Sequence, residues 1–395
     1  MHHRYFIRFA IGVLCSTLLN GQALRAQPAP YTIEVILPMT GPSAFSGQSE
    51  SKAVLAMERM VNDAGGVRGQ HIHFDVHDDQ GSPQVAVELT NAAIASHAPV
   101  IIGAGLTASC SAIGALVERT GPVEYCVSPG YTPATGSYCF AVGVSLQNST
   151  RTYLDFLKSR GLTRLAYVSS NDTTGLVQRQ SVGEALALPE YRDIQIVDEE
   201  KVNPGDLSAS TQVAKIQAAR PDVIMTMTSG TAFGTLVHGL ADAGLDVPML
   251  STTANANRDE LTQFASYLPH QLYFTGYRFQ LGAQLDDRAI RAQATAMTNA
   301  FTLVGAGAPT STQAATWDAA LLVVSGLRQL GPSMTAEQLR DYLLSLHAFP
   351  GVLGTYDFRA NQRGLDQRAL IMVGWRPATL DYYPAANDAG KAVRR

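Results

Sequence analysis

The chain has 395 residues, 46% of them hydrophobic, which is enough for two domains that each bury a core. Its formal net charge is −4, and removing the three arginines among residues 1–26 leaves −7. We expect no nucleic-acid partner for this acidic chain, because Lys and Arg hold the phosphate backbone and no basic run occurs.

The first residues predict a secretory signal peptide. Arg4 and Arg8 precede an apolar run over 9–19, and small residues that suit a signal peptidase follow. The run is shorter than the roughly 20 apolar residues of a transmembrane helix, and no later segment approaches that length. We expect cleavage after Ala26, with Ala23 as the alternative, and a mature chain outside the cytoplasm without direct membrane insertion.

Strand and helix signals alternate through the first 145 residues. A strand at 31–37 precedes a helix whose apolar residues recur at helical spacing over 53–61. Ser82 and Pro83 form an N-cap and first-turn pair that opens the next helix. Further strands are predicted at 71–76, 100–102 and 123–127, and a further helix at 111–119.

The same order restarts after residue 145. Strands are predicted at 165–169, 194–197 and 222–228, and helices through 154–157, from 176, and at 207–219 and 233–243. Repeated strand–helix units predict parallel sheets with helices on both faces, and the restart predicts two lobes. The pattern alone does not assign the later helices at 314–330 and 336–346 to either lobe.

Three cysteines remain after processing: Cys110, Cys126 and Cys139. An exported chain permits disulfides. Cys126 and Cys139 flank a Gly/Pro-rich loop, SPGYTPATGSY, and we expect this loop to bring them together in a disulfide. Neither a Cys-x-x-Cys motif nor a Cys/His pair at zinc-finger spacing occurs, so we expect no cysteine metal site.

Two loops after predicted strands are candidates for ligand contact, because open α/β sheets bind ligands beyond the carboxyl ends of their strands. The first loop, GAGLTAS at 103–109, leads into a helix start and offers the hydroxyls of Thr107 and Ser109. Backbone N–H groups and the helix dipole at such a turn suit a carboxylate, although either hydroxyl has capping of the helix as its alternative role. The second loop, SPGYTP, contains Gly130, Tyr131 and Thr132.

The segment VILPMTGPSAFSGQSESKAVLAMERMVNDAGGVRG at 35–69 reads as a strand, a Gly/Pro turn and a helix closed by glycines. It resembles the opening of periplasmic solute-binding proteins of the leucine/isoleucine/valine type, with TGP at 40–42 and NDAGGVRG at 62–69. The resemblance runs from about Tyr31 to Trp375. It implies an α/β fold of two Rossmann-like lobes with parallel sheets, joined by three crossing segments near 145, 275 and 355.

The resemblance also implies discontinuous lobes. The N-terminal lobe would comprise 27–145 with 276–355, and the C-terminal lobe 146–275 with 356–385, followed by a tail at 386–395. In the first lobe it places Thr107 on the family's carboxylate-binding Ser. The loop at 128–133 resembles the family's S-P-(A/G)-x-T segment, which implies that Gly130 and Thr132 hold the same ligand and that Tyr131 forms a wall of the pocket.

The loops of the second lobe depart from the family pattern. Thr174 stands at the position of an aromatic residue, and Thr253 at the position of the acid that pairs with the ligand's α-ammonium. Ser229 should also reach the cleft, and Tyr277 either lines the pocket or packs at the hinge. A buried ammonium without a carboxylate is unfavourable, so an amine-free carboxylate or an amide competes with an amino acid, unless Asp172 replaces the missing acid.

Other clusters indicate no catalytic or metal chemistry. His71, His73, Asp75 and His77 share one face of a strand, but donors two residues apart are about 6.6 Å apart, so we expect a solvated face. The pair at 78–79 is expected to act in a turn. Fingerprints for phosphate-binding loops, zinc proteases, serine hydrolases and dinucleotides are missing from strand-to-helix contexts, so we predict neither an enzyme nor a cofactor.

The resemblance therefore implies the solute-binding component of an ABC importer. Its partners would be a small solute and a membrane permease with separate ATPase subunits, and we expect a monomer. A sensory binding protein that engages a receptor is the main alternative, and an enzyme on the same fold is the third.

Overall fold

The computed structural model describes residues 29–41 and 43–385. The predicted signal peptide and the predicted tail at 386–395 lie outside this range, as does Pro42.

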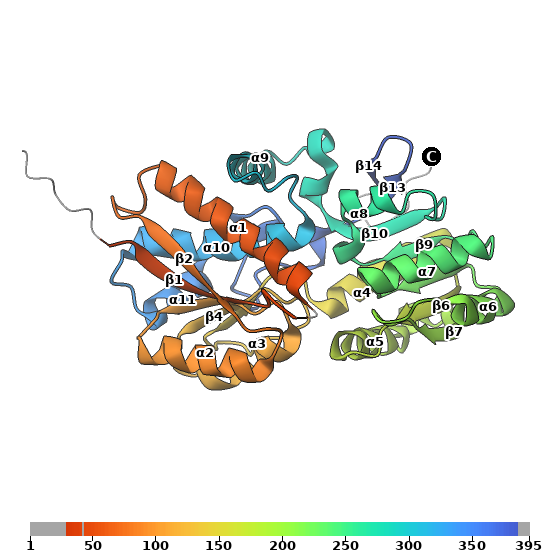
Figure 1. The fold of residues 1–395 in the computed structure, drawn as a ribbon, viewed down its shortest axis with the longest axis horizontal. Coiled ribbons are helices and arrows are strands. Elements are labelled where there is room, and N and C mark those ends of the chain that lie inside the picture. Colours follow the sequence, from red (N-terminus) through yellow and green to blue (C-terminus); the bar gives the residue numbers. More distant parts are fainter. Residues whose placement is uncertain (1–28, 42, 386–395) are drawn as a thin grey trace, which may run out of the picture.

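The first half of the molecule is a five-stranded parallel sheet in the order β2-β1-β3-β4-β5 (Figure 1). One face packs on α1, α9, α10 and α11, and the other face on α2 and α3. The strands are β1 (Tyr31–Leu37), β2 (Ile72–Asp78), β3 (Val100–Gly103), β4 (Val123–Cys126) and β5 (Cys139–Ala141). The helices are α1 (Ala44–Asp63), α2 (Pro83–Ala95), α3 (Thr107–Val117), α9 (Arg288–Leu303), α10 (Ser311–Leu330) and α11 (Ala336–Ser345).

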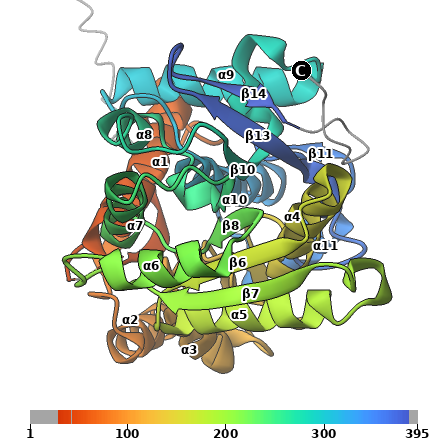
Figure 2. The same ribbon diagram turned by 90° about the vertical axis from the view of Figure 1, so that its right-hand side faces the viewer.

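The second half is a seven-stranded sheet in the order β14-β13-β10-β9-β8-β6-β7. Its strands are β6 (Arg164–Ser169), β7 (Gln195–Lys201), β8 (Val223–Thr226), β9 (Met249–Ser251) and β10 (Leu272–Tyr277), with antiparallel β13 (Leu370–Arg376) and β14 (Asp381–Pro384) at one edge. On one face lie α4 (Leu146–Arg160) and α5 (Thr173–Leu186); on the other lie α6 (Ser210–Ala219), α7 (Thr231–Asp242) and α8 (Arg258–Gln263). Figure 2 shows α7 and α8 on the opposite side of this sheet from α4.

Short elements complete the described chain. The 3-10 turns are η1 (Pro189–Tyr191), η2 (Thr253–Asn255), η3 (Arg278–Gln284) and η4 (Gln367–Ala369), and a small hairpin pairs β11 (Phe349–Pro350) with β12 (Thr355–Tyr356). None of the helices in the described ranges combines the length and the apolar character that crossing a membrane requires.

The chain passes between the two halves after β5, after β10, and between β12 and β13. Tyr277 lies at this junction, where its hydroxyl accepts a hydrogen bond from the Val144 N–H at 3.4 Å. We propose that the lobes divide as 27–145 with 276–355 and 146–275 with 356–385. The grouping of core side chains supports this division, although Phe358, Leu365 and Leu370 pack with the first sheet.

Candidate ligand-binding site

The start of α3 is partly exposed and lacks a side-chain cap. The helix begins at Thr107, and its N-cap residue is Leu106, which has no side-chain capping hydrogen bond. Neither Thr107 nor Ser109 therefore occupies the N-cap, so the alternative capping role is wrong. First-turn N–H groups without an intrahelical partner, together with the positive end of the helix dipole, favour an anion.

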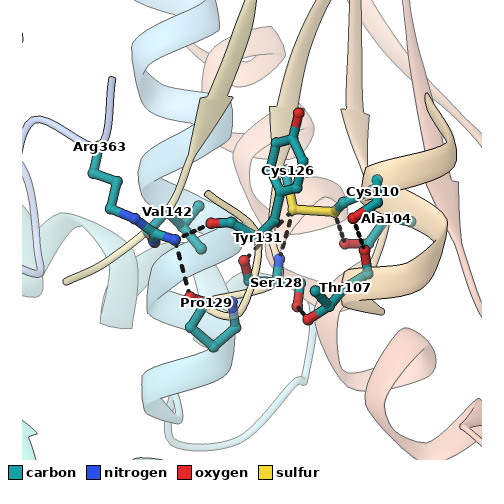
Figure 3. Close-up of a disulfide and its surroundings, with 10 residues drawn as sticks. Ala104, Thr107, Cys110, Cys126, Ser128, Pro129, Tyr131, Val142 and Arg363 are labelled. Atoms are coloured by element: carbon teal, nitrogen blue, oxygen red, sulfur yellow. Dashed lines mark hydrogen bonds between the residues drawn. A yellow bond between two sulfur atoms is a disulfide. The ribbon is translucent and has the colours of Figure 1, made fainter. Parts of the chain in front are cut away.

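The two predicted ligand loops meet at this helix start. The hydroxyl oxygens of Thr107 and Ser128 are 2.8 Å apart (Figure 3). A Cβ atom at Gly130 would overlap the Thr107 hydroxyl, so glycine permits the close approach of the second loop. The loops come together because β3 and β4 are neighbours and end at the same edge of the sheet. Thr132 lies further along the second loop and is exposed.

Two predicted ligand residues turn into the protein instead. Ser109 is fully buried, and its hydroxyl lies beside the buried Asp79 carboxylate, whose charged form it favours. The ring of Tyr131 packs between α3 and β4, where its hydroxyl lies against Gly114 and near Glu124. Burial and the Glu124 carboxylate raise the pKa of Tyr131 above its usual value. The structure therefore places both side chains behind the loops that meet at Thr107.

The predicted Cys126–Cys139 disulfide is wrong. Cys110 and Cys126 form the disulfide (Figure 3), with their Cα atoms 5.8 Å apart. Cys139 is a buried free thiol. In the β4–β5 register Cys139 lies opposite Glu124, two residues from the partner of Cys126. That offset separates Cα atoms by about 8 Å, beyond disulfide reach, whereas α3 packs over the sheet face that carries Cys126.

The disulfide therefore joins the two ligand loops. Cys110 lies one turn into α3 from Thr107, and Cys126 precedes Ser128 by two residues. Beside it, Glu124 is fully buried, and burial raises the pKa of its carboxyl well above the usual range. Burial and the neighbouring Glu124 likewise raise the pKa of the Cys139 thiol to about 12. Burial thus favours the neutral form of each group.

Sequence reasoning missed two residues that anchor the second loop and the segment that follows it up to Val142. Arg363 donates to the carbonyl oxygens of Val142 at 2.8 Å and Pro129 at 3.0 Å, and also to that of Tyr131 (Figure 3). Burial lowers the pKa of Arg363 to about 10, which leaves it protonated at neutral pH. The adjacent Gln362 amide donates to the Ser137 and Cys139 carbonyl oxygens at 2.9 and 3.1 Å. Both residues lie in the irregular turn NQRG, so the spacing of apolar residues could not predict their contacts.

The predicted residues of the second half occupy loops after neighbouring strands. Ser229 follows β8 and is exposed, and Thr253 begins η2 and is half-buried. Thr174 is in the first turn of α5, and its side chain lies outside the described part of the structure. Asp172 is the N-cap of α5, since its carboxylate accepts the Gly175 N–H at 2.8 Å. This cap gives Asp172 a structural role.

Asn255 was also missed and connects these loops. It is fully buried, and its amide donates to the Thr228 carbonyl oxygen at 2.7 Å and to the Ser251 hydroxyl at 2.8 Å. It thereby ties the loop after β8 to that after β9. Tyr277 is 8% exposed and packs at the junction of the halves, in agreement with its alternative hinge role.

A two-sheet α/β fold with polar loops after the strands of both sheets is typical of two-lobed solute-binding proteins. The family model for periplasmic binding proteins matches residues 30–376. The chain belongs to the periplasmic binding protein family, whose members bind substrates rather than transform them.

Known proteins agree with this membership. A Leu/Ile/Val-binding protein homolog 4 of Brucella abortus is 27% identical over 249 residues, covering 59% of this chain and 59% of its own. The match thus spans about three fifths of that relative's length. An extracellular ligand-binding receptor from Rhodopseudomonas palustris HaA2 has a TM-score of 0.79 at 18% identity, covering 90% of this chain and 100% of its own. An ABC transporter solute-binding protein from R. palustris, in complex with benzoate, has a TM-score of 0.71 at 16% identity over 90% of this chain and 95% of its own.

Proposed function

We propose that this protein is the periplasmic solute-binding component of an ABC importer. Its two lobes close around a small solute that carries a carboxylate or amide group. The closed form then presents the solute to a membrane permease with separate ATPase subunits. The observation that carries the proposal is the uncapped start of α3 beside the hydroxyls of Thr107 and Ser128.

The solute's polar end binds in the first lobe. Backbone N–H groups of the first turn of α3 and the Thr107 and Ser128 hydroxyls are donors suited to a carboxylate. Thr132 joins them from the second loop. The opposite lobe contributes small hydroxyl residues on closure, namely Thr174, Ser229 and Thr253.

We propose further that the solute is an amine-free aliphatic or aromatic acid. The family resemblance implies that Thr253 stands where other members have an acid that pairs with an α-ammonium, and the carboxylate of Asp172 is engaged in capping α5. An ammonium buried without an anionic partner is strongly disfavoured. The R. palustris protein was solved with benzoate, so aromatic acids are the first solutes to test. The Brucella relative is named for leucine, isoleucine and valine, so these amino acids serve as the competing solutes.

A thermal-shift screen tests the proposal. The exported chain is heated with benzoate, isovalerate, isobutyramide, leucine, isoleucine or valine. A solute at 100 times its dissociation constant stabilises the folded state by about 2.7 kcal/mol. A shift with the amine-free acids alone supports the assigned class, and a shift confined to the three amino acids refutes it.

Variants then locate the site by calorimetry with the best solute. We expect Thr107→Val and Ser128→Ala each to weaken binding by about 10- to 100-fold, because each removes a hydrogen bond to a charged group worth about 1.5–3 kcal/mol. Ser111→Ala is the matched control, since this exposed hydroxyl bonds to the Thr107 carbonyl oxygen one turn further along α3. Equal affinity in all three variants would refute the placement. Uptake of the radiolabelled solute that survives deletion of the gene would instead favour a sensory role.

A further inference from the structure

A carboxylate–carboxylate–imidazole cluster lies on the first sheet, away from the loops at the start of α3. In the β1–β2 register Glu34 is directly opposite Asp75, and His77 is two residues further along β2. The His77 Nε2 atom is 2.6 Å from a Glu34 carboxylate oxygen and 3.7 Å from an Asp75 carboxylate oxygen. One donor atom of each residue lies within 4.8 Å of the other two.

The charges in this cluster are unbalanced. Among the ion pairs of residues 29–41 and 43–385, Glu34 and Asp75 pair only with His77, and neither meets Lys or Arg. Two carboxylates side by side on neighbouring strands repel each other. One imidazole compensates at most one of the two carboxylate charges, whereas one divalent cation would balance both.

The cluster is accessible to an ion from solvent. Its side chains are 33% exposed at His77, 21% at Glu34 and 50% at Asp75. They lie on β2, the edge strand of the sheet, and on its neighbour β1. The sheet holds the backbone of both strands, so only the side chains have to adjust when an ion binds.

Glu34 on the neighbouring strand supplies the donor that β2 alone lacks. Donors two residues apart on one strand are about 6.6 Å apart, but a neighbouring strand is only about 4.8 Å away. The paired strand thus supplies the third donor. His73 shares the face but pairs with Glu58, at 3.2 Å, and is not a member of the cluster.

We propose that Glu34, Asp75 and His77 bind a divalent transition-metal ion of the Zn²⁺ type. Imidazole and carboxylate are ordinary zinc ligands at about 2.0–2.2 Å, and three of them leave a position for water. Donors around such an ion are about 3.3 Å apart, a spacing that small side-chain rotations reach from the present arrangement. The bound ion would link β1 to β2 through side chains.

Calorimetry with Zn²⁺ on the tag-free chain tests this proposal. We expect one ion per chain, and at least about tenfold weaker binding in His77→Ala and in the isosteric variants Glu34→Gln and Asp75→Asn. His73→Ala is the matched control, because this imidazole lies on the same strand face outside the cluster, and we expect it to bind as the unsubstituted chain does. Circular dichroism of each variant verifies folding.

Co²⁺ gives an independent readout. Its visible absorption should report a nitrogen and oxygen ligand set and should disappear in His77→Ala but persist in His73→Ala. Absence of one-to-one Zn²⁺ binding by the folded chain would overturn the proposal. So would a loss in His73→Ala as large as that in His77→Ala, since surface histidines in general would then be responsible.

Discussion

Removing the disulfide by the double substitution Cys110→Ala and Cys126→Ala should destabilise the folded chain by about 3 kcal/mol. The bridged cysteines are 16 residues apart. Cross-linking a loop of about that length lowers the entropy of the unfolded chain and so stabilises the folded state by about 3 kcal/mol at 25 °C. The melting temperature should fall by about 6 to 12 °C, taking about 2 to 4 °C per kcal/mol. Solute affinity should fall as well, because the disulfide joins the two loops at Thr107 and Ser128.

Urea unfolding followed by circular dichroism measures the change, and Cys139→Ala is the matched control. It removes a buried thiol without a disulfide, so we expect a loss of about 1 kcal/mol. Thiol titration of the denatured mature chain should count one free thiol in the unsubstituted protein and none in Cys139→Ala. Two free thiols in Cys139→Ala would refute the Cys110–Cys126 pairing, because Cys110 and Cys126 would then both be unbridged. A stability loss in Cys139→Ala as large as that in the double variant would refute it as well.

Three further substitutions test buried polar groups. Arg363→Met should destabilise the fold by about 3–5 kcal/mol in urea, because three buried carbonyl oxygens lose their donor, whereas the exposed control Arg359→Met should lose less than about 1 kcal/mol. Asp318→Asn should lose about 2–4 kcal/mol in the same assay at pH 8, because the Asp318 carboxylate accepts hydrogen bonds from two backbone N–H groups and a tyrosine hydroxyl at 2.8–2.9 Å. Unchanged stability would show that the amide satisfies these three donors. Burial raises the pKa of Glu50 from 4.5 to about 8, so its contribution to stability is full below pH 4.5 and is lost as the pH rises through 8. Glu50→Gln should therefore gain stability relative to the parent between pH 5 and 9, and parallel melting-temperature profiles would contradict this.

The elements with strong local signals were predictable. The apolar run at β1 and the glycine-closed helix after it are both present, and Ser82 with Pro83 opens α2 as its N-cap and first residue. The helix predicted at 207–219 begins only at Ser210. Leu207, which was counted as its first apolar residue, is fully exposed, so apolar spacing alone placed the start of the helix wrongly. The strand β9 has three residues, too few to show a period.

Long-range partners were not predictable from local pattern. The proximity of Thr107 to the second loop was predictable, because the carboxyl ends of neighbouring parallel strands lie at the same edge of a sheet. The inward orientation of the Tyr131 ring was not, because it depends on the space between α3 and β4. The choice of Cys110 over Cys139 depends on how α3 sits over the sheet. Arg363 reaches the second loop from more than 200 residues away, as the separations of 221 and 234 residues to its carbonyl partners show.

The hydrogen bonds of Gln362 and Arg363 couple one chain crossing between the halves to the segment from Pro129 to Val142. Both residues lie between β12 of the first half and β13 of the second, yet they hydrogen-bond to the segment from Pro129 to Val142. Under the proposed function, a rotation of one half against the other that moves this crossing would also move the segment proposed to receive the solute, and solute binding to that segment would in turn act on the crossing. Substitutions at this crossing, remote from the solute itself, should consequently alter affinity and the ease of closure together.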